Sequence, residues 1–339
     1  MSIPYRTRCA LKRLGTGVLI VLAVAVLLYA VWLLWLGRFA VYTRDGKVEL
    51  DFSRPATGLS GEVAVKPVNK NPISIYYNEG DDMINTSTEL ARLSGYYVTG
   101  SELEQDLNGV MEQIKQLPKG AAVMVEVKSI YGNFFYSSAV STHRNGDLDI
   151  EAMDAFITQL NKLGYYTIAK VPALRDRKFG LDNQSCGLAE AGGWLWDDGG
   201  FYWLDPTKEG TITFLTQIAL ELRGLGFDEV LFCDYYFPDS GGRIVFNGDK
   251  QEALESTAKA LVKTCATDSF AVSFVQKASF NLPEGRSRLY LENISAIGAA
   301  DAAEQTGLEN PDIRVVFITQ VHDTRFDSYG VLRPISMIY

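Results

Sequence analysis

Three carboxylates in this sequence stand where predicted strands end. Asp234 directly follows the apolar run at residues 229–233, and Glu126 and Glu292 close two other such runs. Hydrolysis of a glycosidic bond commonly uses two carboxyl groups that flank the bond, one protonated and one ionised. We expect Asp234 to be one of them, as nucleophile or as stabiliser of positive charge. In the alternative interpretation Asp234 only caps the turn that follows its strand.

The identity of the second carboxylate stays open between two glutamates. Glu292 lies in the apolar context LYLENI, which favours the protonated form that a proton donor needs. Glu126 could take the same role or bind a sugar hydroxyl; alternatively it pairs with Lys128 or Lys170. No carboxylate ends the predicted strand at residues 270–275, where several sugar-cleaving barrels keep their acid.

A long loop at residues 175–206 follows the third predicted strand and is rich in Gly and Trp. Arg175 at its start is placed to bind hydroxyls or an acidic sugar, and Asp205 near its end to fix a hydroxyl. Flat aromatic faces for sugar rings are offered here and after Asp234 by Trp194, Trp196, Trp203, Tyr235 and Tyr236. The alternative is a loop packed on itself, with Asp205 before a proline as an ordinary helix entry.

Residues that hold metals or cofactors are scarce. The two histidines, His143 and His322, have no neighbour at ligand spacing, and no Cys-x-x-Cys pair occurs. The glycine-rich phosphate loops are also missing. The sequence therefore predicts neither a metal nor a cofactor.

Composition narrows the classes of partner. The chain has 339 residues, of which 47% are hydrophobic and 22% charged, as in a folded protein. Its net charge is −9, and no Lys/Arg-rich stripe is interleaved with aromatic residues. Nucleic acid is therefore not an expected partner.

Residues 16–36 carry no charged side chain, a length that can cross a bilayer as a helix. Just before them stand Arg6, Arg8, Lys12 and Arg13, which by the positive-inside rule places the N-terminus in the cytoplasm. We expect an uncleaved anchor with the rest of the chain outside; a cleaved signal peptide is the alternative. The expected divisions are a cytoplasmic tail (1–15), a transmembrane anchor (16–37), a stalk (38–87) and a globular domain (88–339).

The globular part alternates predicted strands with predicted helices. Strands are expected at residues 95–98, 121–127, 165–171, 229–233, 270–275, 289–292, 313–318 and 331–335. Helices are expected at residues 101–117, 150–163, 208–225, 251–264 and 299–305, the first with Ser101 as N-cap and Glu104 completing a capping box.

This alternation is typical of an α/β fold, here a (β/α)8 TIM barrel preceded by a transmembrane helix and a short stalk. A doubly wound open sheet is the competitor, although it usually brings a phosphate loop. In a TIM barrel the carboxyl ends of the strands meet at one mouth. We therefore expect Glu126, Asp234 and Glu292 to lie at the same end.

Several blocks of the chain resemble a known family. GGWLWDDGGFYWLDPTKEG and GFDEVLFCDYYFP are the most specific, with YYVTGSELEQDLNGVMEQI, AAVMVEVKSIYG and GYYTIAKVPALRDR before them. They are similar to the glycoside-hydrolase-like barrels classed as bacterial domains of unknown function. The resemblance implies a TIM barrel, an extracytoplasmic location and a polysaccharide substrate. Where family members often carry an Asp after the Phe of the fourth strand, this chain has Cys233; Asp234 matches the second Asp of variants with two.

Two functions of different class remain. The first is a membrane-anchored glycoside hydrolase that acts on a cell-surface or environmental polysaccharide by carboxylate acid–base catalysis. The second is a catalytically inactive barrel that binds glycans or serves as a scaffold of the cell envelope.

Overall fold

The computed structural model describes residues 90–337, the short segments 40–42 and 48–50, and a few positions between 25 and 32. The predicted anchor and most of the predicted stalk lie outside the described residues. Among those that are described, no helix has both the length and the apolar character needed to cross a bilayer.

The chain divides into two compact units, Met1–Gly80 and Asp81–Tyr339. In the first unit, β1 (Ala40–Tyr42) and β2 (Val48–Leu50) pair as antiparallel strands. The second unit holds all the predicted barrel strands and every candidate site residue.

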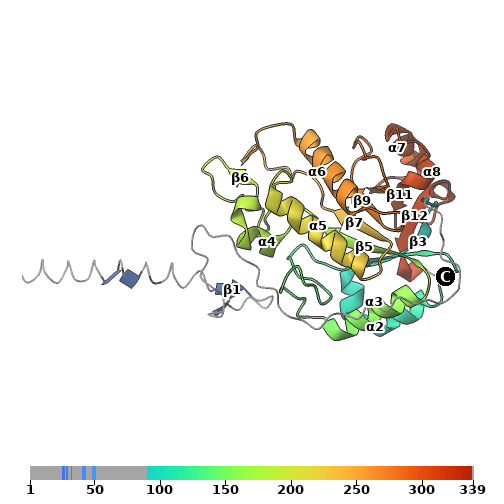
Figure 1. Cartoon of the computed structure of the whole chain (residues 1–339), viewed down its shortest axis with the longest axis horizontal. Coiled ribbons are helices and arrows are strands. Elements are labelled where there is room, and N and C mark those ends of the chain that lie inside the picture. The colour runs from blue at the N-terminus through green and yellow to red at the C-terminus, as the bar shows by residue number, and fades with distance from the viewer. Residues whose placement is uncertain are drawn as a thin grey trace, which may run out of the picture. The chain divides into compact units, whose positions relative to one another are not determined.

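In the second unit eight parallel strands close into a barrel (Figure 1). In chain order they are β3 (Ser94–Val98), β4 (Ala122–Glu126), β5 (Tyr166–Pro172), β7 (Glu229–Cys233), β9 (Ala271–Val275), β10 (Leu289–Glu292), β11 (Val315–Ile318) and β12 (Gly330–Pro334). β12 pairs back onto β3, with Leu332 opposite Gly95. The predicted TIM barrel is therefore confirmed, and the open sheet is wrong. The bounds of β7 and β10 are those predicted, and the other strands differ only at their ends.

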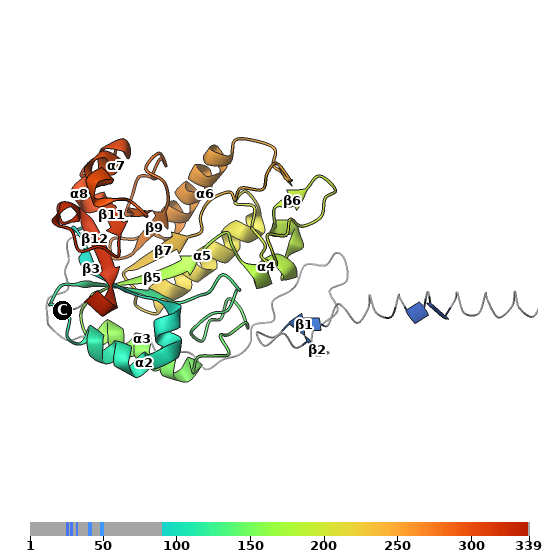
Figure 2. The same cartoon turned by 180° about the vertical axis from the view of Figure 1, so that it is seen from behind.

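Helices surround the strands in both views of the barrel (Figures 1 and 2). They are α2 (Gly100–Ile114), α3 (Ile150–Lys162), α5 (Glu209–Gly224), α6 (Lys250–Cys265), α7 (Ala299–Gln305) and α8 (Pro311–Arg314). Between β5 and α5 the chain makes an excursion through the short helix α4 (Arg177–Asp182) and strand β6 (Ala189–Glu190). β6 pairs with β8 (Ile244–Val245), which follows β7.

The start of α2 differs from the prediction. The N-cap is Thr99, whose hydroxyl accepts from the Glu102 backbone N–H at 3.3 Å, while the Glu102 carboxylate accepts from the Thr99 N–H at 2.8 Å. The capping box at Ser101 and Glu104 is therefore wrong by two positions. Thr99–Glu102 and Ser101–Glu104 both have the three-residue spacing of a capping box, and the helix begins at the earlier pair. Glu104 instead accepts a hydrogen bond from Asn145 at 2.7 Å.

Side chains alternate between two layers along each strand, as the two-residue period of a strand requires. On β7, Val230 and Phe232 point outward into the large core between strands and helices. Leu231 points inward and packs with residues from the other strands that fill the barrel. Glu229 and Cys233 share the inward face with Leu231, one at each end of the strand.

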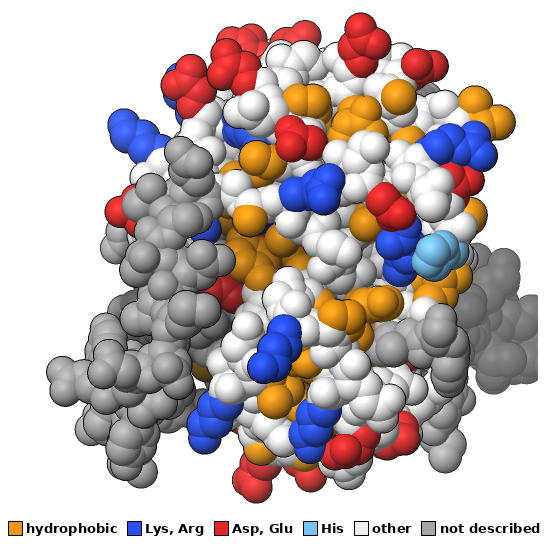
Figure 3. Space-filling view, turned by 90° about the vertical axis from the view of Figure 1, so that its right-hand side faces the viewer, with side chains coloured by type: hydrophobic (Ala, Val, Ile, Leu, Met, Phe, Trp, Pro, Cys, Tyr) orange, Lys and Arg blue, Asp and Glu red, His pale blue; other side chains and the backbone are white. Residues whose placement is uncertain are grey.

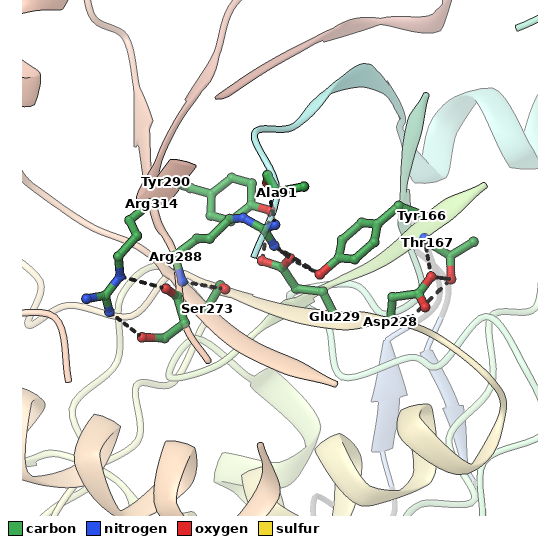
Figure 4. Close-up of polar contacts among 10 residues, drawn as sticks. Ala91, Tyr166, Thr167, Asp228, Glu229, Ser273, Arg288, Tyr290 and Arg314 are labelled. Carbon is green, nitrogen blue, oxygen red and sulfur yellow. Dashed lines mark hydrogen bonds and ion pairs between the residues drawn. The ribbon is translucent and has the colours of Figure 1, made fainter. Parts of the chain in front are cut away.

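The amino-terminal end of the barrel is closed by a buried ion pair (Figure 4). Glu229 accepts hydrogen bonds from the hydroxyls of Tyr166 and Tyr290, both at 2.8 Å, and from the guanidinium of Arg288. Arg288 also donates to the backbone carbonyl of Ala91 at 2.9 Å. Both carboxylate oxygens of Glu229 are satisfied, and neither charged side chain is more than 1% exposed.

The surface drawn in Figure 3 carries charges of both signs. Lys/Arg and Asp/Glu side chains are interspersed on it with apolar ones, and no large patch of a single sign forms on this face.

Candidate active site

Glu126 and Glu292 meet at one lysine inside the barrel mouth. Glu126 is the last residue of β4 and Glu292 the last of β10. The Lys170 ammonium of β5 lies 3.3 Å from Glu126 Oε1 and 3.8 Å from Glu292 Oε1. The structure thus brings two of the three candidate carboxylates around a common cation. It also provides the Lys170 pairing that was one alternative for Glu126.

The alternation of the strands explains this meeting. Lys170 stands two residues after Ile168, and Glu126 two residues after Met124; both apolar residues lie in the barrel interior. Glu292 follows Tyr290 of the interior in the same way. The polar residues therefore form the next layer toward the carboxyl ends of the strands, which is the end where TIM-barrel enzymes carry their chemistry.

Glu126 is held on both of its oxygens. Its Oε2 accepts a 2.7 Å hydrogen bond from the backbone N–H of Gly100, at the first turn of α2, while Oε1 faces Lys170. A helix amino terminus favours a negative group. Glycine at position 100 leaves room for the buried ring of Phe135, which a Cβ there would meet at 2.5 Å.

Lys170 is a cation at neutral pH. Burial by itself would lower the pKa of the ammonium. The charges that Cys233, Glu126 and Glu292 carry when ionised have the opposite effect and outweigh burial, so the pKa of Lys170 is raised. Burial raises the pKa of the Cys233 thiol well above its ordinary value, so that this group stays neutral and the two glutamates carry the effect at neutral pH. Lys170 is therefore suited to balance charge rather than to act as a nucleophilic amine.

Asp234 begins the loop after β7 in a left-handed backbone conformation, with φ of 48°. Asn293, directly after β10, has φ of 59°. Asp and Asn tolerate this conformation better than other side chains with a Cβ, so both strands can turn sharply at the mouth. Burial raises the pKa of the Asp234 carboxyl, and the positive charges of Arg175 and Lys170 only partly oppose it.

An aromatic wall lies beside Asp234. The Arg175 guanidinium stacks over the ring of Phe201 at 4.3 Å and lies 5.6 Å from that of Trp203. The rings of Trp203 and Tyr236 are 4.9 Å apart. Tyr236 is 44% exposed, whereas Trp203 is buried behind it. Tyr236 is therefore the ring of this pair that a sugar can reach.

Most of the other residues proposed for substrate binding are buried within the protein. Trp196 and Tyr235 are buried, and the Tyr235 hydroxyl donates to the Leu254 carbonyl at 2.8 Å. Asp205 is also buried; it accepts from the backbone N–H and hydroxyl of Thr207 at 2.9 and 2.7 Å, as expected for the turn into α5. Trp194 is 78% exposed. The structure therefore places Arg175 and Tyr236 close to Asp234 and gives Trp196, Tyr235 and Asp205 supporting positions.

Besides Lys170, two further polar residues of the mouth were not among the predicted site residues. Burial raises the pKa of the Tyr97 hydroxyl of β3, and the side chain of Gln320, which follows β11, partly opposes this shift. Lys170 and Glu292 also act on this hydroxyl electrostatically. Tyr97 lies on the inward face of its strand, so the two-residue alternation was the signal that could have found it.

Across residues 90–337 no group of three or more His, Cys, Asp or Glu side chains is arranged to hold a metal ion. In the same range Cys186, Cys233 and Cys265 are buried and free.

Residues 95–283, more than half of the chain, match the sequence model of a family described as "Putative glycosyl hydrolase domain". The chain belongs to this family. No curated protein matches it significantly.

Three solved structures are similar to this family member. A hypothetical protein from Ruminiclostridium thermocellum is 18% identical, with a TM-score of 0.46 over 52% of this chain and 96% of that chain. A GH20 exo-β-N-acetylglucosaminidase from Vibrio harveyi is 10% identical, with a TM-score of 0.51 over 72% of this chain and 50% of that chain. The glycoside hydrolase domain of PelA from Pseudomonas aeruginosa is 14% identical, with a TM-score of 0.44 over 73% of this chain and 96% of that chain. At 10% identity the likeness to the Vibrio harveyi enzyme concerns the fold alone.

Proposed function

We propose that this family member is a glycoside hydrolase that cleaves a polysaccharide by acid–base catalysis at the barrel mouth. The observation that carries the proposal is the meeting of Glu126 and Glu292 at Lys170, with Asp234 as a further electrostatic neighbour of that lysine. The membership of the family supports the same reaction class.

Asp234 is best suited to donate the proton to the leaving group. Its burial favours the uncharged acid, and no carboxylate–amine contact within 4 Å binds it among the described residues. A proton donor needs a carboxyl that stays protonated near the working pH. This exchanges the roles expected from the sequence, in which Asp234 was the anion and Glu292 the acid.

Glu292 is then the anion that attacks or stabilises the developing positive charge on the sugar. Lys170 faces its Oε1, and its Oε2 makes no hydrogen bond with the residues that the structure describes. Glu126 has both oxygens engaged, so it supports the other groups. Arg175 and the exposed ring of Tyr236 contact the sugar beside Asp234.

The test is a screen of the full-length chain, in detergent micelles, against a panel of polysaccharides. Release of reducing ends and binding are measured on each. Hydrolysis of at least one glycan, abolished in a Glu292→Gln variant that still binds it, is the expected result. Absence of hydrolysis across a broad panel would count against the enzyme.

A glycan-binding or scaffold role is the second candidate. The observation that favours it is Cys233, whose thiol is buried and uncharged and which, by the family resemblance, stands in the place of an Asp. Binding without release of reducing ends in the same screen would support this role.

The anchor and its orientation are also proposals. They rest on the uncharged segment at residues 16–36 and the basic residues before it. Protease added to intact cells is expected to degrade the barrel and to spare the N-terminal tail. A barrel that survives until the cells are lysed would contradict an extracytoplasmic location.

A further inference from the structure

The contacts at the mouth form one line from a helix terminus to Glu292. The Gly100 N–H of α2 holds Glu126, Glu126 faces Lys170, and Lys170 faces Glu292. Each step links a different element of the barrel. Of these groups only Lys170 touches both carboxylates.

Lys170 is set firmly within this line. Its side chain is 19% exposed, whereas those of Glu126 and Glu292 are 31% and 35% exposed. It extends from the central strand of the β4–β5–β7 group, with the buried Ile168 two residues earlier on the same face. A long cationic side chain that is mostly withdrawn from water, and has a carboxylate on either side, holds those carboxylates at a fixed separation.

We propose that Lys170 is the positioning residue of the proposed hydrolase. It holds Glu292 toward the sugar and keeps its charge from repelling that of Glu126. Two carboxylates that share one site without a cation disfavour each other's ionised form. This inference rests on the proposed function, because it assigns Lys170 a role in that reaction without contact with the reacting atoms.

Several charged or titratable groups face Lys170, and all of them influence how Lys170 affects the pH–rate profile. They are Tyr97 of β3, Glu126 of β4, Cys233 and Asp234 at the end of β7, and Glu292 of β10. Without Lys170 the two glutamates repel each other, so the active ionised form requires a higher pH. The acid limb of the pH–rate profile should therefore move upward.

The experiment compares Lys170→Met and Lys170→Arg with the full-length wild type on a glycan that the wild type hydrolyses. Lys170→Met keeps most of the apolar stem and removes the charge. We expect kcat to fall by about 100-fold, since electrostatic groups of an active site typically contribute on this scale. KM should change little, and the acid limb should shift to higher pH. Lys170→Arg should restore the wild-type acid limb and recover part of kcat.

The matched control is Lys115→Met, which breaks a lysine–carboxylate pair of 2.7 Å with Glu112 on the exposed side of α2. Its kcat and pH profile should equal those of the wild type. Thermal unfolding is recorded for every variant, and Lys170→Arg decides the outcome if Lys170→Met does not fold.

The possible results separate the two proposals. A lower kcat with an unchanged pH profile, or a profile that the arginine does not restore, would overturn the positioning role while the hydrolase stands. A wild type that hydrolyses no glycan would overturn the proposed function and the role of Lys170 with it.

Discussion

Each end of the barrel pairs a cation with carboxylate groups, one at the amino-terminal end and two at the mouth, and the two sites are built differently. At the amino-terminal end Arg288 pairs with Glu229, and both are at most 1% exposed. Two tyrosine hydroxyls also donate hydrogen bonds to the oxygens of Glu229. At the mouth Lys170 serves two carboxylates at 3.3 and 3.8 Å, with roughly a third of each carboxylate side chain exposed.

The difference separates structure from chemistry. A buried carboxylate whose two oxygens both accept hydrogen bonds from buried partners is not accessible to a ligand, and it contributes to specifying the fold. A carboxylate that is partly exposed, with one oxygen held and the other open, is positioned but still available. Glu229 is of the first kind and Glu292 of the second, although each lies at the end of a strand with an apolar interior.

The largest expected effect is on the stability contributed by the Arg288–Glu229 pair at the amino-terminal end of the barrel. Arg288→Met leaves Glu229 buried without its cation, which typically costs about 3–5 kcal/mol of unfolding free energy. Chemical denaturation of the full-length chain measures it. Lys170→Met should lose clearly less, because water reaches the glutamates at the mouth. Equal losses at the two ends would contradict the distinction between them.

The next largest effect is expected on catalysis at the barrel mouth. Asp234→Asn removes the proposed proton donor while keeping the shape of the side chain and the left-handed backbone. Catalytic groups of this kind contribute about 3–4 kcal/mol to the transition state, so kcat should fall by a few hundred-fold. The loss should be much smaller on aryl glycosides with good leaving groups, which need little protonation. An equal loss on both substrates would return Asp234 to the role of anion.

A smaller effect is expected from Glu126, which acts through Lys170 in this arrangement. Glu126→Gln keeps an acceptor for the Gly100 N–H and loses one charge beside Lys170. We expect kcat to fall by roughly 10-fold, equivalent to about 1.4 kcal/mol. The kcat values of Glu126→Gln and Glu292→Gln are compared by steady-state kinetics. A loss from Glu126→Gln that exceeds the loss from Glu292→Gln would make Glu126 the reacting carboxylate.

The fold was predictable because each strand carries its own signal. The run EVLFC at β7, bounded by turn residues, reads as a buried strand, and eight such runs separated by helices leave few architectures. The capping box failed because Thr99–Glu102 and Ser101–Glu104 have the same spacing. Local chemistry alone could not choose between them.

The candidate site was predictable only in part. Strand ends identified the carboxylates, because the carboxyl ends of parallel strands share one mouth. Burial of Trp196 and exposure of Trp194 depend on how the loop after β5 packs, and the aromatic residues of that loop look alike in the sequence. Lys170 was visible only as a possible partner of Glu126, since its contact with Glu292 joins strands that are far apart in the sequence and not adjacent in the barrel.

The smallest expected effect is a gain in stability that grows with pH. Burial raises the pKa of Asp234 in the folded chain above its unfolded value, which is near 3.9 for aspartate. Folding therefore favours the protonated form, and the stability that Asp234 contributes is fully present below the unfolded pKa and is lost as pH rises through the folded pKa. Asn does not titrate, and it accepts the left-handed conformation at this position. Asp234→Asn should match the wild type most closely near pH 4 and become progressively more stable than it toward pH 7, as measured by denaturant unfolding at several pH values. Arg175→Gln should instead lower the stability of the protein at neutral pH, because it removes the strongest positive neighbour of the Asp234 carboxylate. A stability difference between Asp234→Asn and wild type that shrinks as pH rises would mean that the folded protein favours the ionised carboxylate, and the proton would then have to come from another group.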